Sequence, residues 1–74
     1  MDVNKLVHMA NQIGTFFESM PDRPQALTDI ALHLKKFWDP RMRRALLQHI
    51  DEQGGTDLSG IVLQAIQLNK AAIQ

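Results

Sequence analysis

The dipeptide Asp39-Pro40 constrains the fold of this chain more than any other feature of the sequence. A proline ring pushes the preceding residue out of the α region, yet it suits the first position of a new helix. An aspartate in the extended conformation can also cap that new helix by accepting a hydrogen bond from one of its free N–H groups. The dipeptide therefore predicts that one helix ends near Trp38 and that another begins at Pro40.

Apolar residues recur at helical spacing along the chain, and no stretch alternates between apolar and polar residues as a half-buried strand does. Asp2 and Asp22 are suited to cap two helices, and Gly54-Gly55 is suited to end a third in a left-handed conformation. Gly14 costs about 1 kcal/mol relative to alanine inside a helix, which is explained if another helix approaches closely there. The predicted helices cover approximately residues 3–20, 22–38, 40–53 and 59–73.

The connections between the first three predicted helices are two or three residues long, so neighbouring helices must pack as hairpins or sharp corners. A chain of 74 residues forms one small domain. We therefore predict a single all-α domain over residues 1–74, a small bundle of three to four short helices with tight connections. The longer connector at residues 54–57 leaves open whether the fourth helix packs in the bundle or on a partner.

Composition argues against several classes of function. The chain has no cysteine, and hence no disulfide or thiolate metal site, which suits a reducing cytoplasm. Its formal net charge is zero, so no global attraction to nucleic acid or membrane is expected. No apolar run approaches the roughly 20 residues that a membrane helix needs, and residues 1–5 lack the features of a signal peptide. We expect a cytoplasmic chain that binds neither membrane nor nucleic acid.

No arrangement of side chains in the sequence predicts an active site. His8, His33 and His49 lie on three different predicted helices, and none belongs to a motif with metal-ligand spacing. Ser19 and Ser59 lie at helix ends without the motif that surrounds a nucleophilic serine. We therefore predict no catalytic, cofactor-binding or metal-binding residue, and no enzymatic activity for this chain by itself.

The start of the third predicted helix departs from the usual electrostatics of helix ends. Arg41, Arg43 and Arg44 fall in or near its first turn, where the helix dipole disfavours cations by roughly 0.3–1 kcal/mol each. One interpretation is a solvated polar face, in which Arg43 pairs with Asp39 four residues away. The other is a surface that meets acidic groups of another molecule. The segment from residue 35 to residue 44 holds one acidic residue, Asp39, and five basic ones: Lys35, Lys36, Arg41, Arg43 and Arg44.

We predict that this segment docks onto an acidic patch of a larger protein, with Trp38 and Met42 as apolar anchors beside the arginines. A structural interpretation stays open for both anchors, which would then pack in the core. Contact with nucleic acid is a further alternative, because a helix, a tight turn and a basic helix resemble a helix-turn-helix; acidic residues spread along the chain argue against it. The predicted partner-binding residues are Trp38, Pro40, Arg41, Met42, Arg43 and Arg44.

Three stretches carry a resemblance to a known family: LVHMANQIG at residues 6–14, Phe16-Phe17, and FWDPRMR at residues 37–43. A Gly-Gly-x-x-Leu-Ser turn at residues 54–59 and the length of the chain agree with it. The sequence resembles the delta subunit of NAD-dependent formate dehydrogenases that contain molybdenum or tungsten. The similarity extends over nearly the whole chain.

The resemblance implies an accessory role. In these complexes the alpha subunit is the catalytic one and carries a bis-pterin molybdenum or tungsten cofactor and iron–sulfur clusters, while beta and gamma subunits pass electrons to FMN and NAD. The delta subunit is implied to hold no cofactor, to bind the alpha subunit, and to support assembly, cofactor insertion or stability of the active enzyme. Two alternatives stay open: a maturation chaperone that binds transiently, and a small helical nucleic-acid-binding regulator.

Overall fold

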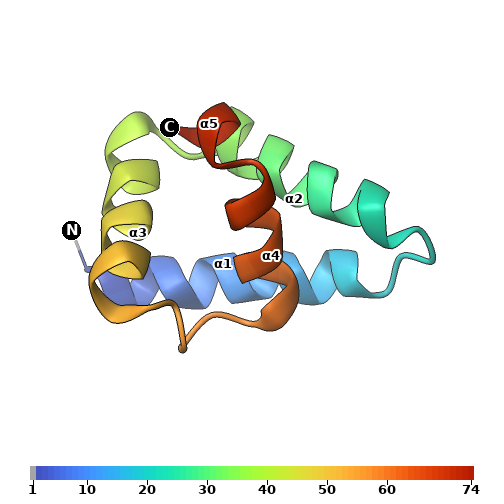
Figure 1. Ribbon diagram of the computed structural model, residues 1–74, viewed down its shortest axis with the longest axis horizontal. Coiled ribbons are helices and arrows are strands. Elements are labelled where there is room, and N and C mark those ends of the chain that lie inside the picture. Colours follow the sequence, from blue (N-terminus) through green and yellow to red (C-terminus); the bar gives the residue numbers. More distant parts are fainter. Residues whose placement is uncertain (1) are drawn as a thin grey trace.

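This computed structural model describes residues 2–74, which contain five helices. They are α1 (Val3–Glu18), α2 (Arg23–Phe37), α3 (Pro40–Gln53), α4 (Gly60–Leu68) and α5 (Lys70–Ile73) (Figure 1). The described residues contain no strand, which confirms the all-α class. None of these helices combines the length and the apolar character that crossing a lipid bilayer requires.

Aspartates begin the first three helices, as the sequence predicts. Asp2, Asp22 and Asp39 each have an extended backbone and a carboxylate that accepts a hydrogen bond from an N–H in the first turn. The bond from the N–H of Met42 to Asp39 is 2.9 Å long. The proline at residue 40 occupies the first position of α3, and α2 ends at Phe37, so the predicted break is confirmed.

The end of α3 also follows the prediction. Gly54 has a left-handed backbone with φ of 83°, and its N–H donates to the carbonyl of Ile50 over 2.7 Å. Gly55 is left-handed as well, with φ of 73°. Side chains other than glycine rarely adopt this conformation, so the two glycines turn the chain from α3 toward α4.

The predicted fourth helix is wrong in one respect, because it is divided at Asn69 into α4 and α5. Asn69 leaves the helical conformation, with φ of −122° and ψ of 25°. Its side-chain amide donates to the carbonyl of Ala65 over 2.9 Å, and its backbone N–H points to the carbonyls of Ala65 and Ile66. An asparagine side chain competes in this way with regular helix bonds. The turn directs Ile73 into the core, where 2% of its surface is exposed.

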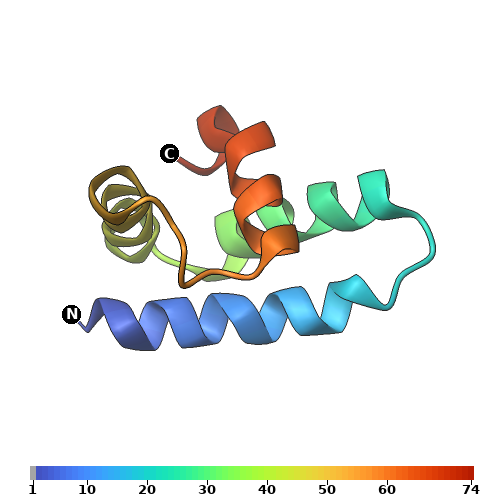
Figure 2. The ribbon, with the colours of Figure 1, turned by 60° about the horizontal axis from the view of Figure 1, so that its bottom comes forward.

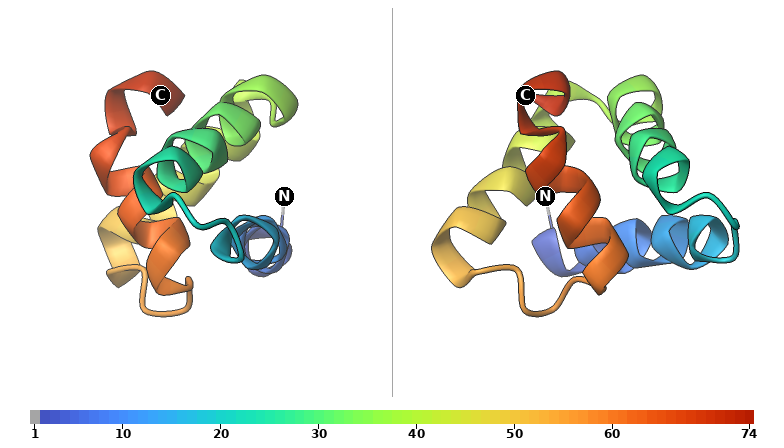
Figure 3. Two further views of the ribbon diagram at one scale, coloured as in Figure 1. Left: turned by 90° about the vertical axis from the view of Figure 1, so that its right-hand side faces the viewer. Right: turned by 45° about the vertical axis from the view of Figure 1, so that its right-hand side comes forward.

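The α4 helix packs within the bundle and not away from it. It lies between α3 and α2 and above α1 in the views of Figures 1 and 2, and Figure 3 shows it from two further sides. It contacts both α1 and α2. The α1 and α2 helices run in opposite directions along the molecule. The core is formed by buried side chains of all five helices and of the connections before α3 and α4: Leu6, Val7, Ala10, Ala26, Leu27, Ile30, Ala31, Leu34, Trp38, Leu46, Leu47, Leu58, Ile61, Val62, Ala65, Ile66 and Ile73.

Gly14 lies where α1 meets α4. A methyl group at this position would collide with the side chain of Val62 and would come within 3.1 Å of the hydroxyl of Ser59. A contact as short as that with Val62 is not tolerated unless a neighbouring group shifts. The close approach predicted from this glycine is therefore confirmed.

Candidate functional site

Arg43 is half-buried and is held by backbone carbonyl groups. Its Nε donates to the carbonyl of Ile73 over 3.0 Å, and its Nη1 donates to the carbonyls of Lys35 over 2.9 Å and Trp38 over 2.7 Å. The first acceptor belongs to α5, the second to the last turn of α2 and the third to Trp38, the residue that caps α2. The helix dipole favours a cation at this end of α2. Arg43 thus joins three elements and has a structural role, while its contact with a partner stays a prediction.

The alternative explanation for Arg43, a pair with Asp39, is not supported either. The Asp39 carboxylate caps α3 through the N–H of Met42, and no ion pair joins it to Arg43 in residues 2–74. The guanidinium is instead stabilised by hydrogen bonds to neutral backbone carbonyls and by the dipole at the C-terminal end of α2. These hydrogen bonds form only because α2, α3 and α5 lie close together, and the spacing of residues in the sequence does not predict that arrangement.

Trp38 belongs to the core, with 5% of its surface exposed. It follows the last residue of α2, so its direction is set by the turn and not by helical spacing. This burial supports the structural interpretation of Trp38: the turn before Pro40 folds the indole inward, where its large apolar surface stabilises the bundle. Its contact with a partner stays a prediction. Met42 is half-buried and packs against the same core.

Three of the predicted contact residues lie on the surface. Pro40, Arg41 and Arg44 are exposed, and neither arginine forms an ion pair in the described part of the chain. Their contact with a partner stays a prediction. Of the three arginines in the basic segment, Arg43 binds other parts of the chain, whereas Arg41 and Arg44 face solvent.

A surface that the sequence did not single out lies across α1 and α2. We call it the aromatic groove; four rings form a row along it, from Phe16 and Phe17 on α1 to His33 and Phe37 on α2. Successive ring centroids are 5.0, 6.4 and 4.7 Å apart, with the first two pairs edge-to-face and the third tilted. Phe16 and Phe37, at the two ends of the row, are 70% and 67% exposed.

The aromatic groove consists of two adjoining hollows that share Phe17 and His33. The first has a volume of about 450 Å³ and the second of about 520 Å³. Trp38 also lines the first hollow, although little of its surface is exposed. The remaining lining residues are Met9, Gln12, Ile13 and Phe16 in the first hollow, and Asp29, Leu32, Lys35, Lys36 and Phe37 in the second.

The aromatic groove is mostly apolar with a basic edge. Lys35 and Lys36 line the second hollow, and the Lys36 ammonium nitrogen lies 5.9 Å from the centre of the Phe37 ring. Asp29 is the one acidic residue among the residues that line the two hollows. One signal in the sequence pointed to this surface: Phe16 widens the apolar stripe of the first helix beyond the arc that a core needs.

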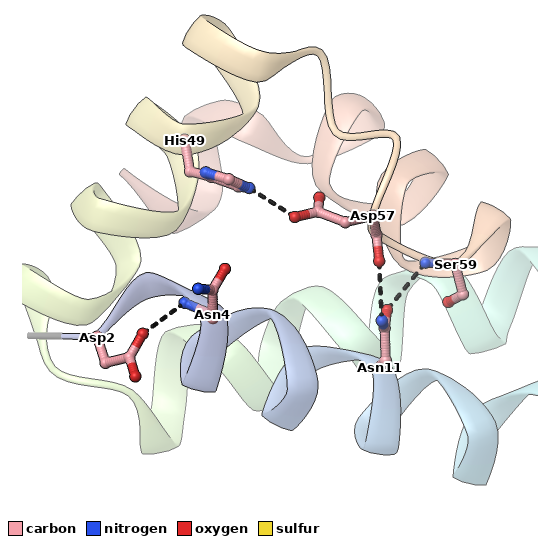
Figure 4. A network of polar contacts seen from close by, with 6 residues as sticks. All are labelled: Asp2, Asn4, Asn11, His49, Asp57 and Ser59. Carbon is pink, nitrogen blue, oxygen red and sulfur yellow. Dashed lines mark hydrogen bonds and ion pairs between the residues drawn. The ribbon is translucent and has the colours of Figure 1, made fainter.

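A cluster of polar contacts among Asn11, His49, Asp57 and Ser59 has a structural role (Figure 4). His49 Nε2 lies 2.8 Å from Asp57 Oδ2, which ties α3 to the connector that follows it. Asn11 on α1 donates to the carbonyl of Asp57 over 3.1 Å and accepts from the N–H of Ser59 over 2.9 Å. The connector is therefore fastened to two helices, which explains why α4 stays in the bundle.

No cluster of ligating side chains accompanies these contacts. Within residues 2–74, no group of three or more histidine, aspartate or glutamate side chains is placed to hold a metal ion. The three histidines lie apart: His8 is exposed on α1, His33 belongs to the aromatic groove, and His49 is bound to Asp57.

The sequence can now be compared with known families. Residues 5–66 match the family described as NADH-dependent formate dehydrogenase delta subunit, FdsD. The chain belongs to this family. The match with FdsD extends from α1 into α4 and includes the aromatic groove, Trp38 and the start of α3, so the resemblance seen in the sequence is confirmed. Comparisons with curated proteins and with solved structures gave no match.

Proposed function

We propose that this chain is a non-catalytic accessory subunit that binds the large catalytic subunit, alpha, of an NAD-dependent formate dehydrogenase. In that complex it supports assembly, cofactor insertion or stability of the active enzyme. Membership of the FdsD family supports the association with formate dehydrogenase. The observation that carries the binding role is the aromatic groove, where large apolar side chains remain exposed beside a basic edge.

Exposed phenylalanine side chains that lie together indicate a binding surface. Single exposed apolar residues are common on soluble proteins, whereas contiguous patches usually mark interaction sites. Burying a phenylalanine side chain fully contributes about 1.5–3 kcal/mol relative to leaving it in water. Most of this stabilisation would become available on binding for three side chains that are now exposed: Phe16 (70%), Phe37 (67%) and Leu32 (58%).

The prosthetic groups of the complex are proposed to reside in the other subunits. Iron–sulfur clusters are held by cysteine thiolates, and this chain has no cysteine. Its donor set therefore does not fit such a cluster. We assign the bis-pterin molybdenum or tungsten cofactor and the clusters to the alpha subunit, with FMN and NAD served by the beta and gamma subunits.

Co-purification tests the proposal. A tagged chain expressed together with an untagged alpha subunit should retain it, and Arg41→Glu or Arg44→Glu should reduce the retained fraction if these arginines meet carboxylates of alpha. Lys5→Glu on α1 is the matched control, because Lys5 is exposed, forms no ion pair in residues 2–74 and lies outside the basic segment.

The outcomes separate the parts of the proposal. Failure of the wild-type chain to retain alpha contradicts the binding role itself. If the arginine variants retain alpha as well as the wild-type chain does, the binding role stands, but Arg41 and Arg44 are not part of the contact. One copy of the chain for each alpha subunit in active, purified enzyme identifies a permanent subunit, and its absence identifies a maturation factor.

A further inference from the structure

The exposed large apolar side chains of this molecule gather at one place. Four such residues are exposed in residues 2–74, and three of them, Phe16, Leu32 and Phe37, line the aromatic groove. The fourth, Leu68 on α4, lines neither hollow. A scatter of surface residues would not concentrate in this way, so the groove is suited to be covered by a second molecule.

The architecture restricts what can cover it. Peptides that bind as an added β-strand need a free sheet edge, and the described residues contain no strand. A groove between two helices instead accepts the apolar face of another helix, with side chains three or four residues apart as anchors. Phe17 and His33 line both hollows, so we expect one anchor of the helix in each hollow, in contact with these two side chains.

Charge restricts the occupant further. The second hollow has Lys35 and Lys36 on its edge, and its one acidic residue, Asp29, already accepts a hydrogen bond from the side chain of Gln25 over 2.8 Å. An occupant with carboxylates beside its apolar face would match this edge. A second copy of the chain fits less well, since a two-fold interface pairs this patch with itself, and the patch carries two lysines and one acidic residue.

We propose that the aromatic groove binds an amphipathic helix of the catalytic subunit, which inserts large apolar side chains into the two hollows and directs acidic side chains to Lys35 and Lys36. This inference rests on the proposed function and specifies which element of the partner is recognised. It also gives the groove a role distinct from that of Arg41 and Arg44, which lie on α3.

Photo-crosslinking in the assembled enzyme tests the proposal directly. A benzophenone amino acid is placed at position 16 or 37, and at position 68 as the matched control, which has a similarly exposed apolar side chain outside the groove. We expect positions 16 and 37 to link to one alpha-subunit peptide with apolar residues at helical spacing and flanking acidic residues, and position 68 to give no link to it. Links to a second copy of the chain, or no links from positions 16 and 37, would overturn the proposal.

Binding measurements provide the second arm. Phe16→Ser and Phe37→Ser should each weaken binding of alpha about tenfold, as expected for apolar anchors at an interface. Leu68→Ser should leave the dissociation constant unchanged. Lys35→Glu combined with Lys36→Glu should weaken binding at low salt and show a smaller loss at high salt, where the charge contacts are screened.

Failure of this inference differs from failure of the proposed function. If wild-type chain binds alpha while both phenylalanine variants bind equally well, the groove is not the docking site and the accessory role stands. If wild-type chain does not bind alpha at all, both are overturned. Circular dichroism of each variant verifies folding, and the crosslinking arm does not depend on variants that remove side chains.

Discussion

At the start of α3, three arginines that are close in sequence have different surroundings. Arg41 and Arg44 extend into solvent, whereas Arg43 donates three hydrogen bonds to carbonyls of α2, the α2–α3 connection and α5. A planar guanidinium with donors in a fixed fork can serve several acceptors at once, which an ammonium group cannot do in the same geometry. This single side chain therefore fixes the position of the C-terminal turn relative to α2.

We expect Arg43→Ala to lower the free energy of unfolding by about 1.5–3 kcal/mol, the range for hydrogen bonds to a charged group. Arg43→Lys should recover little of this loss, because lysine lacks the forked donors. Urea unfolding followed by the fluorescence of Trp38, the one tryptophan in the chain, provides the measurement. Arg44→Ala is the control and should change stability by less than about 0.5 kcal/mol, as for other exposed positions.

Among individual residues, the sequence predicted the capping aspartates and the glycine roles because each depends on local backbone geometry. For Trp38 the sequence left two interpretations open, core and partner contact, and the surroundings of Arg43 could not be predicted. Trp38 lies beyond the end of a helix, where spacing no longer indicates a direction. The partners of Arg43 are carbonyls up to 30 residues away in sequence, and any residue type supplies a carbonyl.

At the scale of elements, the contact between α1 and α4 shows how one missing side chain determines helix placement. Gly14 allows Val62 to approach the α1 backbone, and Ser59 and Ile61 lie beside it. The boundaries of α1, α2 and α3 agree with their predicted ranges to within two residues because caps and prolines mark them. The break at Asn69 was missed because apolar spacing continues through it at Leu68, Ala72 and Ile73.

We expect Gly14→Ala to be destabilising even though alanine is the better helix former. The gain in helix propensity is about 1 kcal/mol, and overpacking against Val62 costs about 1–3 kcal/mol. The expected net loss is up to about 2 kcal/mol in thermal or urea unfolding. Gly60→Ala is the matched control: a methyl group there meets nothing within 4 Å, so stability should stay the same or rise. Equal stability of the two variants would contradict the close approach.

At the scale of the whole molecule, the chain has a small core and leaves the apolar side chains of the aromatic groove exposed. The chain measures 33 × 21 × 17 Å, so it encloses a single small core. Domains of this size bury a smaller fraction of their surface than larger ones and have marginal stability alone. The groove was not predicted because it depends on how α1 packs against α2, and helical spacing alone places Phe16 and Phe37 at the margins of apolar stripes.

Binding should stabilise the whole fold by mass action. With the free alpha subunit at about 100 times the dissociation constant, the free energy of unfolding of this chain should rise by about 2.7 kcal/mol. Hydrogen exchange measured by mass spectrometry on peptides from α2 and α4 distinguishes this chain from its partner. The slowest amides should exchange about 100-fold more slowly in the complex. Unchanged exchange rates in these two helices would show that binding of alpha does not stabilise the fold of this chain.

The polar contacts of the 54–59 connector have a consequence for how two copies of the chain can interact. Exchange of α4 between neighbouring molecules would require this connector to open as a hinge. Asn11 holds it at Asp57 and Ser59, and His49 holds the Asp57 carboxylate. An extended connector would lose these three contacts, whereas the contacts of α4 with the core would re-form in the other copy. The cost therefore falls on the hinge itself and disfavours intertwined dimers.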